Sequence, residues 1–402
     1  MGCCCALPIR GSPPISTASM PAPRSAPCCG SSPQRLADTM SRLTALFSRP
    51  AQRPAVRPIG ADFAARRLNL VQADVRDGRW HLRAAASVPY PLPRGELFAA
   101  PKRLARFVDA ALASAPFQGR RVVSALPPAD VRILPLTVHL AAGQPEAQAV
   151  AKAAAEQLGS TATDHVLDYY QVRGADADGT ERQVLVAAAL QTRVLAYLAT
   201  LETARLEPLA LDIGPTAISR LLGTMHGNEV GQSVALLNFG ARKSYLTVIW
   251  GRRLMLDREI DFGEERLARS LATALDLPPD TATHLLREHG IGGRANAQDE
   301  LGQAIREILH ADCRALADEL AHTQVYVASR TRGSSISRIY LNGSLARYPD
   351  IHARIGELID VPVHLLNPLG AFEHALPEAR ATELATPLAL AAGLALRGGL
   401  RG

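Results

Sequence analysis

Three short turns, each directly after a strand-like segment, carry residue types that could bind a phosphate group. They are residues 62–66 (DFAAR), 238–244 (NFGARKS) and 342–344 (NGS). A phosphate-binding turn needs backbone N–H groups that face the ligand, a Gly where the ligand approaches closely, and usually a hydroxyl donor. The candidate binding residues are Asp62, Ala64, Ala65, Arg66, Asn238, Gly240, Ala241, Gly343 and Ser344.

The first turn lacks two of these features. Ala64 removes conformational freedom where a Gly would be expected, and Ala65 removes the hydroxyl. Arg66 could supply a cation in their place, but an Arg in a turn is more often simply solvated. An altered phosphate site and an ordinary hairpin turn both fit. Asp62 is the best candidate for a Mg²⁺ ligand.

The second turn keeps Gly240 for a close approach but has Asn238 where a metal-assisted site would use a carboxylate. Asn238 can form hydrogen bonds but brings no charge. In the third turn, Gly343 would allow a base or a ribose to lie against the backbone, and a plain strand-to-helix turn explains it equally well. We therefore expect a weakened site for ATP and Mg²⁺, and we predict no catalytic residue.

Other polar residues give no sign of a second chemistry. Asp212 precedes Gly214 and Pro215, which favours a helix N-cap over the general base of a kinase. The eleven His are scattered, and the chain contains no HExxH or GxSxG motif and no Cys–His pair. The sequence thus indicates neither a hydrolase nor a metalloenzyme.

The net charge of +6 comes entirely from one end of the chain. Residues 1–57 hold seven Arg and one acid, so the remaining residues sum to zero and do not indicate nucleic-acid binding. No apolar run reaches the roughly 18 residues of a membrane span. Only Cys313 lies beyond the first 30 residues, which fits a reducing cytoplasm.

The order of patterned segments predicts a duplicated α/β architecture. We expect a disordered extension at 1–57, of which 1–39 could be a start-site artefact because Met40 offers another start. A first lobe at 58–128 and 191–232 is interrupted by an inserted subdomain at 129–190. A second lobe follows at 233–345, with a helical subdomain at 264–335. The chain then returns to the first lobe at 346–402.

From about residue 40 onward the chain resembles the PilM family, the cytoplasmic actin-like proteins of type IV pilus assembly, on the branch related to FtsA. The opening "PIGADFAARRLNLVQ" is similar to the family's "IGIDIGSSSVKLVEL". Further similar segments follow in the family's order: "ALLNFGARKSYLTVIWG", "REIDFGEERL", "IYLNGSLARYPDI", "LLNPLGAF" and "AAGLALR".

The resemblance implies a two-lobed actin-like fold with a small inserted subdomain. It also implies a scaffold that binds the N-terminal cytoplasmic tail of a PilN-like inner-membrane protein and so couples the assembly platform to the pilus motor proteins. Family members bind ATP between the lobes. This chain departs from the family at those motifs in four ways. Ala64 replaces a Gly, Ala65 replaces a hydroxyl residue, and Asn238 replaces an Asp. The fourth departure is the loss of the second Gly from two Gly-Gly pairs, where this chain has Ser344 and Glu264.

Three other classes remain as alternatives on the same fold. An active ATPase or small-molecule kinase would need a pair of carboxylates around Mg²⁺, where this chain has Asp62 and Asn238. A polymerising protein like FtsA would need an anchor helix after a linker, whereas this sequence stops at "RGGLRG". A secretion-system relative such as GspL would need a membrane span.

Overall fold

The computed structural model describes residues 56–141, 143–173, 181–226, 232–251, 253–292, 300–331 and 333–397. From Arg57 onward these residues belong to one compact unit. Residues 1–55 of the extension predicted at 1–57 lie outside the described residues.

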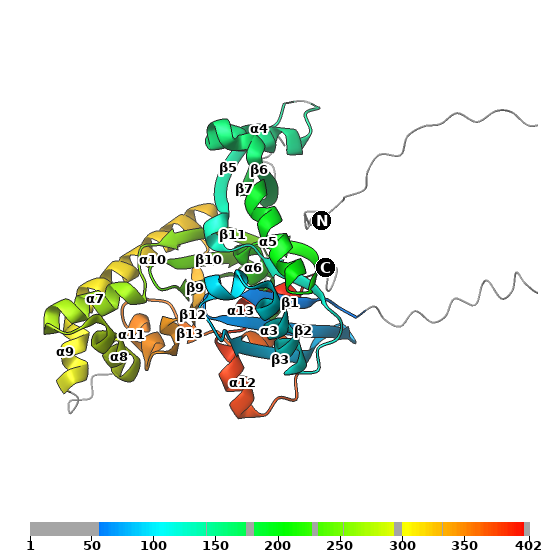
Figure 1. Ribbon diagram of the computed structural model, residues 1–402. Coiled ribbons are helices and arrows are strands. Elements are labelled where there is room, and N and C mark those ends of the chain that lie inside the picture. The colour runs from blue at the N-terminus through cyan, green and yellow to red at the C-terminus, as the bar shows by residue number, and fades with distance from the viewer. Residues whose placement is uncertain are drawn as a thin grey trace, which may run out of the picture. The chain divides into compact units, whose positions relative to one another are not determined.

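The first sheet begins with an antiparallel meander and continues with two parallel strands, in the order β3-β2-β1-β4-β8 (Figure 1). Asp77 and Gly78 join β2 to β3 at φ of 50° and 75°, which matches the two-residue turn that the Asp-Gly pair predicts. The strands are β1 Ile59–Phe63, β2 Arg67–Arg76, β3 Arg79–Pro89, β4 Arg121–Ala125 and β8 Glu207–Asp212.

The second sheet repeats this arrangement in the order β11-β10-β9-β12-β13. Here too a three-stranded meander is followed by parallel strands, and Asn238 pairs in register with Asn342 across β9 and β12. The strands are β9 Ser233–Phe239, β10 Ser244–Trp250, β11 Arg253–Ile260, β12 Ile336–Gly343 and β13 Val363–Leu365.

β13 pairs with β12, and Ile351, Ile355 and Val363 belong to the core of the second lobe. Residues 351–365 therefore pack with the second sheet.

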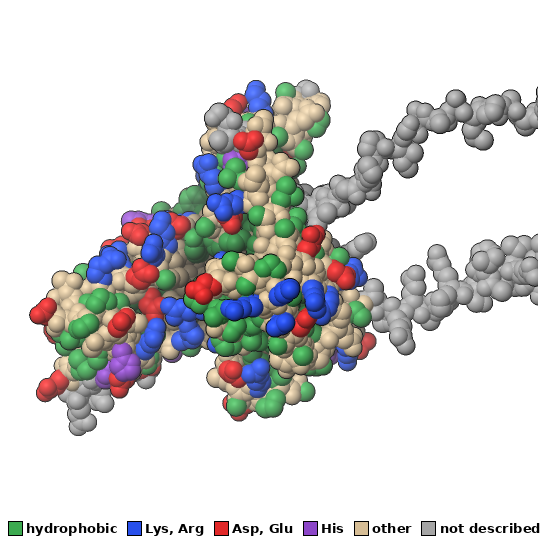
Figure 2. Space-filling view, viewed as in Figure 1, with side chains coloured by type: hydrophobic (Ala, Val, Ile, Leu, Met, Phe, Trp, Pro, Cys, Tyr) green, Lys and Arg blue, Asp and Glu red, His purple; other side chains and the backbone are tan. Residues whose placement is uncertain are grey.

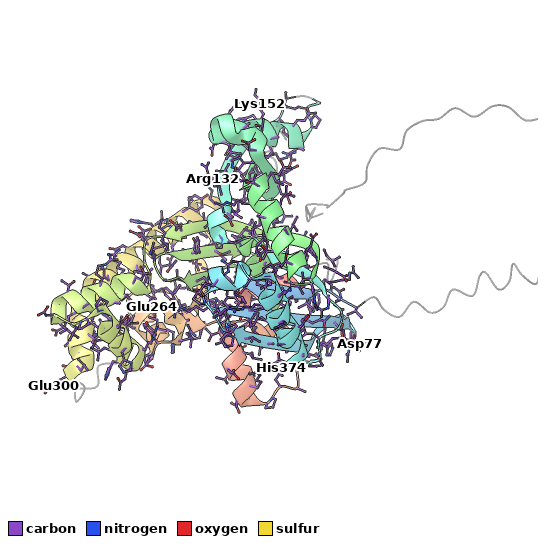
Figure 3. The ribbon with its side chains drawn as sticks, viewed as in Figure 1. Asp77, Arg132, Lys152, Glu264, Glu300 and His374 are labelled. Carbon is purple, nitrogen blue, oxygen red and sulfur yellow. The ribbon has the colours of Figure 1, made fainter. Side chains whose placement is uncertain are left out.

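A third, antiparallel sheet, in the order β5-β7-β6, lies between β4 and β8 in the sequence and forms the inserted subdomain. Helix α4 packs on one face, against alternate residues such as Leu136 and Val186. Figure 3 marks Arg132 at the start of β5 and Lys152 on α4. The elements are β5 Arg132–His139, α4 Glu146–Leu158, the 3₁₀ helix η2 Gly159–Asp164, β6 His165–Arg173 and β7 Glu181–Leu190.

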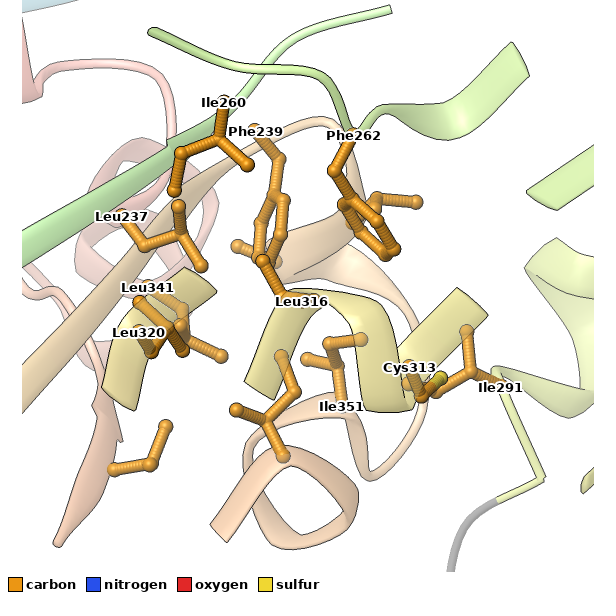
Figure 4. Packing of buried hydrophobic residues seen from close by; sticks show 14 of the residues in the cluster. Leu237, Phe239, Ile260, Phe262, Ile291, Cys313, Leu316, Leu320, Leu341 and Ile351 are labelled. Atoms are coloured by element: carbon orange, nitrogen blue, oxygen red, sulfur yellow. The ribbon is translucent and has the colours of Figure 1, made fainter. Parts of the chain in front are cut away.

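The other helices surround the two large sheets. Helices α7 to α11 pack on the second sheet around Phe239, Leu316 and Leu341 (Figure 4). The helices are α2 Arg94–Phe98, α3 Pro101–Ala113, α5 Gln191–Thr203, α6 Gly214–Met225, α7 Glu264–Leu275, α8 Pro279–His289, α9 Glu300–Ile308, α10 His310–Arg330, α11 Ile351–Gly356, α12 Glu378–Ala385 and α13 Ala389–Ala395, with the 3₁₀ turns η1 Pro128–Asp130, η3 Leu345–Arg347 and η4 Pro368–Ala371.

Helices α6 and α13 join the two lobes through a common core. Residues of both sheets, including Val71 and Leu236, pack around Leu221 and Ala392 of these helices. The helices and β1 approach so closely that a Cβ atom at Gly60 would lie 2.1 Å from the carbonyl oxygen of Ala391, and one at Gly393 would lie 2.1 Å from that of Ala217. The two Gly residues therefore set the spacing between the layers.

Candidate functional site

The carboxylate of Asp62, at the end of β1, is held by a chain of hydrogen bonds within the first lobe. Asn69 Nδ2 donates to Asp62 Oδ2 at 2.9 Å, and Ser87 Oγ donates to Asn69 Oδ1 at 2.7 Å. Arg67 Nε in turn donates to Ser87 Oγ at 2.8 Å. The sequence singled out Asp62 but missed these partners, which come from the neighbouring strands β2 and β3.

Arg94 adds a positive charge beside Asp62. Its guanidinium lies 4.7 Å above the ring of Phe98, and that ring packs edge-on against Phe63, next to Asp62. Burial raises the pKa of Asp62 to about 6, although the Asn69 hydrogen bond and the charge of Arg94 both lower it. Arg94 belongs to no recognisable motif, so nothing in the sequence pointed to it.

The raised pKa of Asp62 has a consequence for stability. The folded protein holds the Asp62 proton more tightly than the unfolded chain, so the free energy of unfolding should fall as pH rises from about 4 to about 6. Asp62→Asn removes this titration and should stabilise the protein by about 1–2 kcal/mol at pH 8, with little effect at pH 4. Thermal melts at both pH values measure it, with the exposed turn variant Asp77→Asn as control. An equal gain at both pH values would contradict the prediction.

The second and third turns pack against each other. The side-chain amides of Asn238 and Asn342 lie 3.1 Å apart, and the N–H of Ser344 donates to the carbonyl oxygen of Phe239 at 2.9 Å. Gly343 has a φ of 91°, and a Cβ there would lie 2.1 Å from the same Phe239 oxygen. This close approach of the two turns accounts for Gly343 without a ligand.

Gly240 is also required by the protein's own backbone. A Cβ at this position would lie 2.3 Å from the carbonyl oxygen of Lys243, across the turn. A Cβ at Gly263, just before α7, would lie 2.5 Å from the carbonyl oxygen of Ala241. The start of α7 is thus held directly against the second turn, which places Glu264 beside it.

A pocket of about 560 Å³ opens between the first turn and helices α7 and α8. This volume falls within the roughly 300–1,000 Å³ of small-molecule sites. Of the predicted residues, Arg66 and Ala241 line it, whereas the other seven do not. The wall is formed by Arg66, Ala241, Glu264, Glu265, Ala268, Arg269, Ala272, Thr273, Leu277, Pro279, Asp280, Thr283 and Arg287.

Charges of both signs line this pocket in equal number: three Arg and three acids. Glu264, labelled in Figure 3, accepts a hydrogen bond from the hydroxyl of Tyr348 and lies 3.9 Å from Arg287. Only 18% of its side chain is exposed. Glu264 is thus a partly buried anion in the pocket wall, with Tyr348 and Arg287 as its partners.

A second, narrower pocket of about 110 Å³ lies where the inserted subdomain meets the rest of the unit. Its wall includes Ile133, Leu185 and Ala187, which alternate with the residues that face α4 and so lie on the opposite face of the third sheet. The wall also includes the C-terminal end of β8, the first half of α6 and Leu254 of β11. We call this the subdomain pocket. The sequence did not predict it.

Two Arg side chains and Asp212 lie at the first-lobe side of the subdomain pocket. Arg220 and Arg397 donate to Asp212 Oδ2 at 2.8 and 3.2 Å, and only 7% of the Asp212 side chain is exposed. The predicted helix N-cap is therefore wrong: Ile213 is the N-cap residue of α6, and its own N–H binds Asp212 Oδ1. The two ion pairs also leave this carboxylate unavailable as a general base.

No cluster of three or more His, Cys, Asp or Glu side chains in the described ranges is arranged to hold a metal ion. Within the same part of the chain, no helix has both the length and the apolar character of a membrane span.

Comparison with known proteins identifies the family. The sequence profile described as type IV pilus assembly protein PilM matches residues 60–399. A solved PilM–PilN type IV pilus biogenesis complex is similar over 86% of this chain and 99% of the other, with 25% identity and a TM-score of 0.68. The search of curated proteins returned no match.

Other solved structures match more weakly. The ethanolamine utilization protein EutJ from Carboxydothermus hydrogenoformans matches with 14% identity and a TM-score of 0.45, over 91% of this chain and 99% of the other. MreB5 of Spiroplasma citri bound to ADP matches with 11% identity and a TM-score of 0.44, over 84% and 95%. The profile and the PilM–PilN match together show that the chain belongs to the PilM family of type IV pilus assembly proteins and has its two-lobed actin-like fold.

Proposed function

We propose that the protein is a non-catalytic scaffold that binds the N-terminal cytoplasmic tail of a PilN-like inner-membrane protein in the subdomain pocket. The observation that carries this proposal is the apolar wall formed by Leu185 and its neighbours on the face of the third sheet opposite α4. Through this tail the protein would lie on the cytoplasmic side of the inner membrane, between the assembly platform and the motor proteins.

The size and chemistry of the subdomain pocket suit a peptide better than a metabolite. Its volume of about 110 Å³ is below the range of small-molecule sites, but side chains of an extended peptide need only narrow apolar recesses. The Arg220 and Arg397 guanidinium groups at its edge can donate to the carbonyl oxygens of such a peptide. The similar solved structure is itself a complex of PilM with PilN.

We further propose that nucleotide binding is weakened or lost. Asp62 is bound by Asn69, and Asn238 lies against the amide of Asn342. Neither arrangement presents two carboxylates to a Mg²⁺ ion. Glu264 brings a carboxylate into the larger pocket, whose wall contains only Arg66 and Ala241 of the predicted nucleotide-binding residues.

The scaffold proposal is tested by titrating a synthetic peptide of the PilN-like tail from the same organism into the full chain. Calorimetry should show one binding site per chain in the absence of nucleotide. Two peptides serve as controls: a scrambled tail and a tail with its apolar residues replaced by Ser. Equal heats for all three peptides, or no binding of the native tail, would rule the proposal out.

An active ATPase or small-molecule kinase is the second candidate, and the 560 Å³ pocket is the observation that favours it. The wild-type chain should bind Mg–ATP weakly or not at all. Restoring the motif residues with Ala64→Gly, Ala65→Ser, Asn238→Asp and Glu264→Gly should raise the affinity at least about tenfold, since one charge-assisted contact contributes about 1.5–3 kcal/mol. Calorimetry with Mg–ATP measures both proteins. Micromolar binding by the wild type would instead support the ATPase.

A further inference from the structure

The exposed side of helix α3 carries a row of cations. Lys102, Arg103 and Arg106 are all exposed, and none forms an ion pair or side-chain hydrogen bond within the described part of the chain. At the other end of the helix, Asp109 binds both Arg120 and Arg205, at 2.6 and 3.3 Å. Figure 2 shows Lys and Arg side chains in a row across the first lobe over α3. We call Lys102, Arg103 and Arg106 the α3 basic row.

Neither helix stability nor composition explains the α3 basic row. The first turn of α3 contains no acidic residue, although cations are unfavourable at this end of a helix. Other helices of the chain, among them α4, α7 and α8, do carry an acid in the first turn. Residues 58–402 have no net charge, so the cations gathered on α3 are offset by acids elsewhere.

We propose that the α3 basic row contacts the anionic headgroups of a membrane surface. Exposed cations without partners provide the charge complementarity, and phospholipid headgroups bind Lys and Arg without requiring a shaped pocket. The nearby aromatic rings of Tyr90 and Phe107 pack against each other 5.5 Å apart. They therefore offer no stacking surface for single-stranded nucleic acid. No large hydrophobic side chain among the described residues of α3 is strongly exposed, so the contact is electrostatic.

The choice of a membrane over an acidic protein rests on the proposed function, because a PilN-like tail would hold the chain within a tail's length of the inner membrane. The two contacts would then reinforce each other: peptide binding raises the effective concentration of lipid at α3. A weak electrostatic contact is sufficient under these conditions.

The test is sedimentation of the full chain with vesicles, without any tail peptide. Phosphatidylcholine vesicles in which about two in five lipids are anionic phosphatidylglycerol should bind the protein. Pure phosphatidylcholine vesicles should not. Lys102→Glu, Arg103→Glu and Arg106→Glu together should lower the partition coefficient at least about 100-fold, because each cation contributes about fivefold. Raising the salt to about 0.5 M should release the wild type.

The control reverses three exposed cations on the second lobe, Arg253, Arg314 and Arg330, which keeps the same net charge as the α3 variant. The Arg residues of 1–57 are present in every protein, so a loss specific to the α3 variant is assigned to α3. Equal losses in both variants, or binding to a DNA duplex but not to anionic vesicles, would overturn the proposal. Because no tail is present, the outcome is independent of tail binding in the subdomain pocket.

Discussion

Replacing Leu185 with Glu should lower the affinity for the PilN-like tail at least about 100-fold. Leu185 lies in the apolar wall of the subdomain pocket and is only 7% exposed. Losing a buried Leu contact costs about 1.5–3 kcal/mol, and a carboxylate facing an apolar peptide adds a desolvation penalty. Calorimetric titration of the tail peptide measures the change.

A matched control lies on the same strand. Leu190, at the end of β7, is 38% exposed and outside the lining of the subdomain pocket. Leu190→Glu should therefore bind the tail like the wild type. Leu185→Ala keeps the wall apolar and should give an intermediate loss, and circular dichroism checks that each variant is folded. Wild-type affinity in folded Leu185→Glu would show that the tail binds elsewhere.

Replacing Gly393 with Ala should destabilise the whole unit by about 3 kcal/mol or more. The added Cβ would lie 2.1 Å from the carbonyl oxygen of Ala217 and 2.6 Å from its carbonyl carbon, so α13 and α6 must move apart. These helices carry the core shared by both lobes, and the strain cannot be relieved by a surface side chain. We expect the melting temperature to fall by on the order of 5–10 °C.

Gly95→Ala is the control for this substitution. Gly95 also lies in a helix, α2, but a Cβ there meets no atom within 4 Å. Ala is favoured over Gly in a helix by up to about 1 kcal/mol, so this variant should melt at or slightly above the wild-type temperature. Equal melting temperatures for Gly393→Ala and the wild type would mean that α6 and α13 are not packed as described.

Local sequence patterns predicted most of the strands and helices. The meanders of both lobes follow from alternating apolar residues and from turn residues such as Asp77 and Gly78, whose conformations are set within a few positions. The buried closing helix α13 follows from its apolar run. The late strand β13 lies within VPVHLLNP (361–368), a segment whose residues also indicate a strand.

The candidate site was harder to predict because its contacts join distant parts of the chain. Asp212 looked like a helix cap since its ion-pair partner Arg397 is 185 residues away. Gly343 resembled a ligand-binding Gly, but its close neighbour is Phe239 of another strand. The subdomain pocket collects residues from the inserted sheet, β8, α6 and β11, so no single segment carries its signature.

We propose that this PilM family member binds its membrane partner without acting as an ATPase. The most direct test is to titrate the tail peptide into the wild-type chain twice, once with saturating Mg–ATP and once with no nucleotide and excess EDTA. We predict the same stoichiometry and the same affinity, within about twofold, in both titrations. Tail binding that appears only with Mg–ATP, or that changes tenfold or more with it, would contradict the account.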